Sequence, residues 1–330
     1  MKINGCYVFP GLIISAKAIG AHRPDESIDS AMRILLQFGE CLPRSMADAS
    51  LRCDIDRMNH ILLHKTDYMI CNMQENNDKK LVALLNLYVY LAHVLHYFKP
   101  WLVGAVSLRM VELTLKVGLS AQSPLVFAYF GGILVTSGCI TKGCRLGELY
   151  DIGIWDQHGL VHISFRCYLF FTFHLRIGKL ALKLVEKKGS IQYKSSVICF
   201  VYDRIIFISE PFQLIANAHL LGHRCGQQSG DFLYALTNQI LAIKSDYAAG
   251  HNLDKVQKNT LEFLSVLQGH GLKIFRNFPL FLLSQIMVLK EGLHMAGVAH
   301  VDNMPQEGQI LASANPGSNV SLYGKIHHLT

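Results

Sequence analysis

Charged residues are scarce in this sequence. Asp, Glu, Lys and Arg together make up 17% of its 330 residues, whereas hydrophobic residues make up 51%. A typical globular protein has about 25% charged residues, and disordered chains combine high charge with few apolar side chains. The composition therefore excludes a disordered chain. Proline is also scarce, with 9 residues, and the 26 glycines follow no period, which excludes collagen-like and flexible linker sequence.

The sequence also lacks the short motifs that mark common enzymes. It contains no Gly-x-x-x-x-Gly-Lys-Ser/Thr phosphate loop, no Gly-x-Gly-x-x-Gly motif, no nucleophile elbow and no His-Arg-Asp catalytic loop. The string Gly178-Lys179-Leu180 lacks both the first glycine and the hydroxyl residue of a phosphate loop. We therefore expect no catalytic activity in this chain, no cofactor and no cofactor-binding residue.

The group of residues that most resembles a metal site is His219-x-x-x-His223, with Cys225 nearby. Two histidines one helical turn apart can bind one ion, but no acidic ligand or general base lies between them. The chain has 16 histidines, so a structural role for such a pair is favoured. Cys139 and Cys144 would supply only two ligands. We therefore expect no metal site at either place.

Other polar groups have simpler explanations. His327 and His328 lie in a polar tail, where we expect them to be solvated. Asp54-x-Asp56 has neither the glycine nor the terminal glutamate of a calcium loop. The nine cysteines form no Cys-x-x-Cys pair and are typical of buried thiols in a reducing compartment. We therefore expect a cytoplasmic protein.

The net charge of the chain is modest, at +7. Short basic clusters at residues 78–80 and 186–188 have none of the interleaved aromatic side chains of a nucleic-acid interface. A solvated surface explains these clusters better, so we expect no nucleic-acid partner.

Because the sequence contains long apolar runs, a membrane protein is the alternative to a soluble one. Residues 81–98 and 124–140 approach the length of about 20 residues that a spanning helix needs. Polar side chains interrupt the first run and two glycines the second, and a buried helix of a soluble protein has the same hydropathy. We expect a soluble chain that does not enter a membrane. The alternative is a small multi-spanning membrane protein that uses these two runs.

Helix start and stop signals recur along the chain. Acidic residues after Pro24 begin a segment with one apolar face, and Gly39 lies where a left-handed C-cap is expected. Asp231 is a natural N-cap, and Ala235 is small where a partner helix would cross closely. These signals predict helices at 24–38, 79–98, 106–117, 123–134, 178–188, 211–222, 231–250, 254–267 and 278–293.

Only residues 197–208 are β-branched enough to suggest strands. A lone strand pair cannot build a sheet-based domain. Helices joined by short Gly and Pro turns describe antiparallel helical hairpins, and a helix pair about every 35 to 45 residues is the spacing of repeat solenoids. The sequence therefore predicts an all-α fold of stacked helical hairpins with degenerate repeats.

Several strings together resemble a known family. They lie at residues 108–120, 178–184, 229–235, 249–253 and 279–297. In this order and spacing they resemble the tetratricopeptide-like helical region of large multidomain signalling proteins. Those proteins join a Ser/Thr kinase-like part, an AAA-type predicted ATPase, this helical region, and often GAF and histidine kinase domains. The resemblance covers about residues 25–309, most of the chain.

The resemblance implies a tetratricopeptide-like helical-hairpin solenoid that serves as a non-catalytic scaffold or sensor segment. Such a segment would mediate protein–protein or interdomain contacts in signal transduction, with proteins or neighbouring signalling domains as its partners. The chain would then be a fragment or truncated relative of a multidomain kinase/ATPase. No active-site residue of the family maps onto this sequence, because the kinase motifs and the phosphate loop are absent.

The sequence departs from the family pattern at one place, where an additional segment divides the helical region. The family string would continue from Gly147 directly to Lys179, whereas here residues 148–178 intervene. We hypothesise that this insert is a translated intron, and we expect it to loop out of the helical stack. The predicted organisation is an N-terminal segment at 1–24, helical repeat regions at 25–147 and 179–302, the insert at 148–178, and a flexible tail at 303–330.

Overall fold

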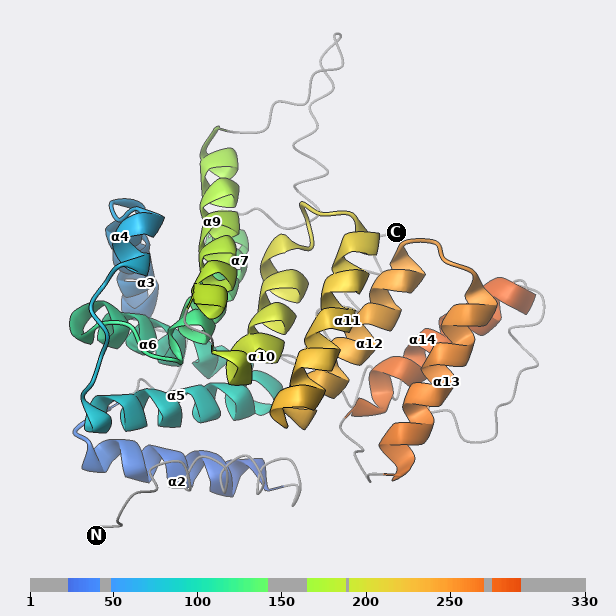
Figure 1. The fold of residues 1–330 in the computed structure, drawn as a ribbon, viewed down its shortest axis with the longest axis horizontal. Helices are drawn as coiled ribbons and strands as arrows, with labels where there is room; N and C mark the ends of the chain where they lie inside the picture. The colour runs from blue at the N-terminus through green and yellow to red at the C-terminus, as the bar shows by residue number, and fades with distance from the viewer. Residues whose placement is uncertain (1–22, 42–48, 142–164, 188–189, 270–274, 292–330) are drawn as a thin grey trace. The chain divides into compact units, whose positions relative to one another are not determined.

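The computed structural model describes residues 23–41, 49–141, 165–187, 190–269 and 275–291. Within these residues it contains twelve α-helices and no strand, so the predicted all-α class is confirmed. The helices pack mainly against their neighbours in the sequence (Figure 1). Internal contacts divide the chain into two compact units: unit 1 comprises residues 1–193 and 204–206, and unit 2 comprises residues 194–203 and 207–330.

Unit 1 is built from the helices of the first half of the chain. They are α2 (Pro24–Gln37), α3 (Ala49–Leu63), α4 (Asp67–Cys71), α5 (Lys79–Phe98), α6 (Val103–Val117), α7 (Ser123–Thr141) and α9 (Phe165–Lys187), with a 3₁₀ turn, η2 (Pro100–Leu102). The packed pairs are α2 with α5, α5 with α6, α6 with α7, and α7 with α9, while α3 packs on α6 and α7. Figure 1 shows α2 beside α5, and α7 beside α9.

Unit 2 begins within α10 (Ile191–Val201), which continues into a π-helical turn, η3 (Tyr202–Ile206). Its other helices are α11 (Phe212–Ser229), α12 (Phe232–Ala248), α13 (Leu253–Gly269) and α14 (Asn277–Glu291). Each of these four packs against the next (Figure 1). Helices α12, α13 and α14 share a core that consists of Leu236, Ile240, Ile243, Val256, Phe263, Leu267, Leu282 and Ile286.

The predicted local signals for helix ends are confirmed at several places. Gly39 follows α2 in the left-handed region, with φ +77°, and its N–H donates to the Leu36 carbonyl at 3.0 Å. Glycine adopts this conformation without a steric penalty, and the bond satisfies one of the last carbonyls of the helix. Asp231 caps α12, because its carboxylate accepts the Tyr234 N–H at 3.3 Å. Helix α5 has the predicted bounds, 79–98.

The expectation of strands at 197–208 is wrong. Residues 197–201 belong to α10, and residues 202–206 form the π-helical turn. Val197, Ile198 and Phe200 are all buried. An apolar run that is buried on every side has no polar face to reveal its period, so the sequence pattern alone does not separate strand from helix.

The predicted start of α13 needs a smaller correction. The helix begins at Leu253, whereas the predicted start is 254. Its cap is Asn252, since Asn252 Oδ1 accepts the N–H of Asp254 at 2.9 Å and the N–H of Lys255 at 3.2 Å. Asp254 lies in the first turn, where its charge is favourable to the helix dipole.

Part of the predicted insert lies in a helix. Residues 148–164 fall outside the described residues, whereas residues 165–178 form the first part of α9, which continues without a break to Lys187. Phe173 and Ile177 are buried, so the end of the predicted insert, residues 173–178, packs within unit 1 and does not loop out. The neighbouring prediction of a helix at 178–188 therefore captured only the second half of α9.

Helix α5 lies in the interior of unit 1. It is the one helix within the described residues that is long and apolar enough to cross a membrane, with a mean hydropathy of 1.6, and 61% of that window is buried. The apolar stretch Ser123–Thr136 of α7 is shorter than a span. Core helices of soluble proteins meet the same criteria of length and composition, and α5 has the contacts of a core helix, against α2 and α6.

The cap of α13 can be tested by substitution. Replacing Asn252 with Ala removes the acceptor for two N–H groups, so we expect the free energy of unfolding to fall by about 1 kcal/mol. Urea unfolding followed by circular dichroism measures this loss. Lys255→Ala, at an exposed residue of the same turn, is the control, and a loss as large in the control as in Asn252→Ala would contradict the assignment of the cap.

Buried His93 predicts a pH dependence of stability. Burial lowers its pKa to about 3, so the unfolded chain binds a proton below about pH 6.5 while the folded chain does not. The free energy of unfolding therefore falls as the pH falls from about 6.5 towards 3, by about 1.4 kcal/mol per pH unit for this residue. Between pH 6 and 4, His93→Gln is expected to make the pH dependence of the free energy of unfolding shallower by that amount. Parallel profiles for the unaltered chain and His93→Gln would refute the prediction.

Candidate functional site

His219 and His223 lie on the face of α11 that packs against α12. The exposed fraction of His219 is 1%, and its Nδ1 lies 2.8 Å from Asn238 Oδ1. His223 Nδ1 donates to the Ala235 carbonyl at 2.8 Å. Burial lowers the pKa of His219 and outweighs the opposing hydrogen bond with Asn238. Both rings are therefore hydrogen-bonded to α12. Cys225, nearby in the sequence, is a half-buried free thiol.

Asn238 connects three helices of unit 2. It is fully buried, and its Nδ2 donates to the carbonyls of Ser195 on α10 and Tyr234 on α12, both at 2.9 Å. These bonds orient the amide so that Oδ1 accepts the Nδ1–H of His219 on α11. A buried polar group without a partner costs about 1–3 kcal/mol, and here both amide atoms are satisfied. The predicted histidine therefore belongs to a network that fixes helix positions.

Two glycines allow α11 and α12 to approach closely. A Cβ atom at Gly222 would lie 2.6 Å from Asn238 Cγ, and one at Gly226 would lie 2.7 Å from Ser195 Oγ and 2.9 Å from Ala235 Cα. These separations are shorter than van der Waals contact distances, so a side chain at either position would force the two helices apart. The prediction that Ala235 marks a close helix crossing is confirmed.

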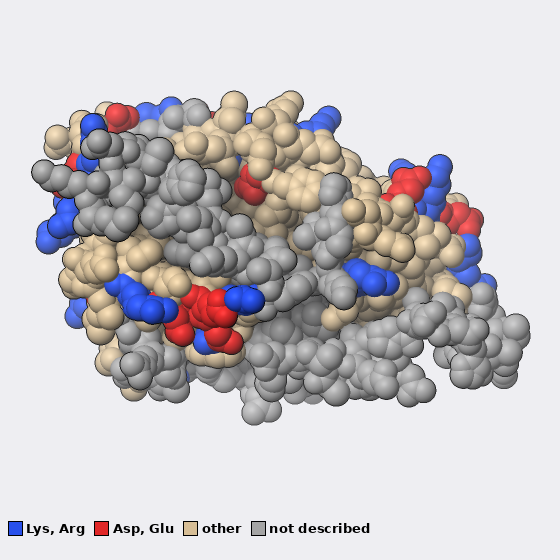
Figure 2. Space-filling model, turned by 90° about the horizontal axis from the view of Figure 1, so that it is seen from below, with Lys and Arg blue, Asp and Glu red and all other residues tan. Residues whose placement is uncertain are grey.

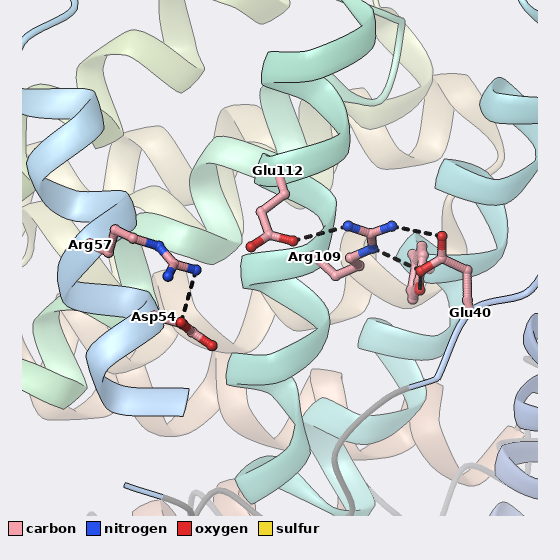
Figure 3. A network of polar contacts seen from close by, with 6 residues as sticks. Glu40, Asp54, Arg57, Arg109 and Glu112 are labelled. Carbon is pink, nitrogen blue, oxygen red and sulfur yellow. Dashed lines mark hydrogen bonds and ion pairs between the residues drawn. The ribbon is translucent and has the colours of Figure 1, made fainter. Parts of the chain in front are cut away.

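The other candidate residues lie apart from this network in the sequence. Asp54 forms an ion pair with Arg57 on the exposed surface of α3, at 2.9 Å (Figure 3). Cys144, His327 and His328 lie outside the described residues, as does the side chain of Cys139. Within the part of the chain that the structure describes, no group of three or more His, Cys, Asp or Glu side chains is placed to hold a metal ion.

A charged network that the sequence analysis missed lies in unit 1. The Arg109 guanidinium donates to both carboxylate oxygens of Glu40, at 2.7 and 2.9 Å, and to Glu112 at 3.1 Å (Figure 3). Tyr88 donates its hydroxyl hydrogen to Glu40 at 2.8 Å. The hydrogen bond with Arg109 is the largest cause that lowers the pKa of Glu40, against the opposing effect of burial. The network ties the segment after α2 to α5 and α6.

A second basic side chain of unit 1 binds the turn between α3 and α4. Arg176 on α9 donates to Asp67 Oδ1 at 2.7 Å, to the Leu62 carbonyl at 3.3 Å and to the Lys65 carbonyl. An arginine presents several donors in a fixed plane, which suits contact with a carboxylate and carbonyls at once. Arg176, like Arg109, therefore positions a chain segment.

The two predicted basic clusters make contacts within unit 1. Asp78 caps α5, and Lys80 lies 5.8 Å from the centre of the Phe38 ring. Lys187 donates to the Cys71 carbonyl at 2.9 Å. On the face that Figure 2 shows, coloured basic and acidic side chains lie next to one another without an extended area of one sign.

Comparison with known proteins identifies no relative. No protein-family model matches this chain, and no match is found among curated proteins or solved structures. The resemblance to the tetratricopeptide-like region of signalling proteins therefore depends on the sequence strings alone and stays a prediction.

The close crossing of α11 and α12 predicts a sensitive position. Gly226→Ala places a methyl group against Ser195 and the Ala235 backbone, so we expect a loss of about 1–3 kcal/mol in the free energy of unfolding. Gly269→Ala is the matched control, because no atom lies within 4 Å of a Cβ at this helix end. We expect the control to be neutral or stabilising. Equal stability of the two variants in urea unfolding would show that the crossing is not tight.

Proposed function

We propose that this chain is a non-catalytic, tetratricopeptide-like scaffold or sensor segment that binds protein partners or neighbouring domains of a signalling protein. The observation that carries the proposal is the serial packing of α11, α12, α13 and α14, each on the next. The sequence strings at 108–120, 178–184 and 229–235 support it, through their resemblance to that family. Any kinase or ATPase chemistry then belongs to other parts of such a signalling protein.

The helices of unit 2 have the dimensions of helical repeats. Helices α11, α12, α13 and α14 contain 18, 17, 17 and 15 residues. Since α11 begins at Phe212 and α13 at Leu253, a helix pair occupies about 40 residues, within the range of helical repeat proteins. In such arrays each repeat contacts its neighbours, and the remaining surface is available for partners.

A pair of leucines on α11 offers a specific contact surface. Leu214 and Leu221 are 53% and 42% exposed. They lie two helical turns apart, on the side of α11 opposite the buried His219 and Gly226. Single exposed leucines are common on protein surfaces, but two at this spacing match the anchor positions of helix-in-groove recognition. We call them the outer leucine pair.

The outer leucine pair favours an apolar partner surface. Covering the exposed part of each leucine would contribute about 1 kcal/mol, because complete burial of such a side chain contributes about 1.5–3 kcal/mol. A partner that presents an apolar helix face or peptide would gain this energy at both positions without disturbing the α11–α12 crossing.

Affinity capture with matched variants tests the proposal. The double variant Leu214→Asp/Leu221→Asp places two charges on the contact surface and leaves the buried face of α11 unchanged. We expect proteins captured by the unaltered chain to fall at least about tenfold in abundance with this variant, a change of about 1.4 kcal/mol in binding. Quantitative mass spectrometry of the captured proteins measures the effect.

The control is Leu261→Asp, which places a charge at a leucine of α13 that is 50% exposed. It should retain the captured proteins, and circular dichroism should show unchanged helix content and melting for all variants. Capture of the same proteins at the same abundance by all three chains would show that the outer leucine pair binds no partner. Capture of no protein by the unaltered chain would count against a scaffold function as a whole.

A further inference from the structure

A second pair of histidines lies on the surface of unit 1. His60 is in the last turn of α3, His64 follows the end of that helix, and both side chains are exposed. Their Nε2 atoms are 3.4 Å apart, whereas their ring centres are 4.5 Å apart. Because the nitrogen atoms are closer together than the ring centres, both nitrogens face the space between the rings.

This separation fits the geometry of an imidazole-bound metal ion. A Zn²⁺ or similar ion lies about 2.0–2.1 Å from each histidine nitrogen. Two nitrogen atoms 3.4 Å apart then make an angle of about 110° at the ion, close to tetrahedral. The tautomer with hydrogen on Nδ1 presents both Nε2 lone pairs to the ion. The two side chains therefore already hold their Nε2 atoms at a suitable distance.

We propose that His60 and His64 form a two-histidine site for a divalent transition-metal ion such as Ni²⁺, Cu²⁺ or Zn²⁺. Imidazole favours these ions over Mg²⁺ and Ca²⁺, which take oxygen ligands. No third His, Cys, Asp or Glu of the described residues completes a larger cluster. Water or a ligand from a second molecule fills the remaining coordination positions. The site is independent of the scaffold function proposed above.

The same sequence spacing has a different outcome at His219 and His223. His219 is buried, and both rings use Nδ1 to bind α12. At His60 and His64 both rings are exposed and their Nε2 atoms face each other. The His-x-x-x-His pattern does not encode exposure or ring orientation. These two properties favour a metal site at His60 and His64 over one at His219 and His223.

Calorimetric titration of the untagged full chain with Ni²⁺ tests the site. Ni²⁺ is preferred to Zn²⁺ as the probe, because the nine cysteines of the chain would compete for Zn²⁺. At pH 7.5 in the presence of a phosphine reductant, His60→Gln and His64→Gln should each weaken the same site at least about tenfold, since each removes one of the two protein ligands.

Two further variants separate this site from other histidines. His64→Gln/Ile61→His keeps the number of histidines but places the second ring about 100° around α3 from His60, at a position inside the helix, so it should lose the site as well. His328→Gln, in the polar tail, should bind as the unaltered chain does. Unchanged binding by His60→Gln or by the spacing variant, or loss of the site in His328→Gln, would overturn the proposal. Circular dichroism of each variant shows that the fold is retained.

Discussion

The backbones of α11 and α12 approach so closely that no side chain fits at Gly222 or Gly226. Polar groups at such a crossing lose their water, so each needs a partner inside the protein. Asn238 meets this requirement through its bonds to α10, α11 and its own helix. Because the crossing fixes α12, it also sets the position of the apolar face on which α13 packs, and α14 continues the series. The packing of unit 2 therefore depends on this one close contact.

In unit 1, charged side chains hold segments of the chain in position. Arg109 joins Glu40 to α6, and Arg176 joins the turn after α3 to α9. In both cases a guanidinium satisfies several acceptors that belong to different segments. The lowered pKa of Glu40 has its cause in this pairing, so the shift is explained by structure without a catalytic role.

Much of the helical pattern could be predicted from local residues, but not every helix. Helix α3 was missed although its buried residues Leu51, Ile55, Met58 and Leu62 follow a helical spacing. Their signal was weak because polar residues surround them and no Gly or Pro marks the start of the helix. Missing α3 also concealed the surface pair His60 and His64, while the identical spacing at His219 and His223 attracted attention. Spacing alone does not distinguish a buried pair from an exposed one.

By itself the sequence determined where several helices begin and end, since caps such as Gly39 and Asp231 act through bonds to residues within a few positions. It also determined the all-α class, through the number of such signals. Only the tertiary structure decided that residues 197–206 are helical and which histidines are exposed. The physical reason is that burial depends on the helices that pack around a residue, and those helices come from distant parts of the chain.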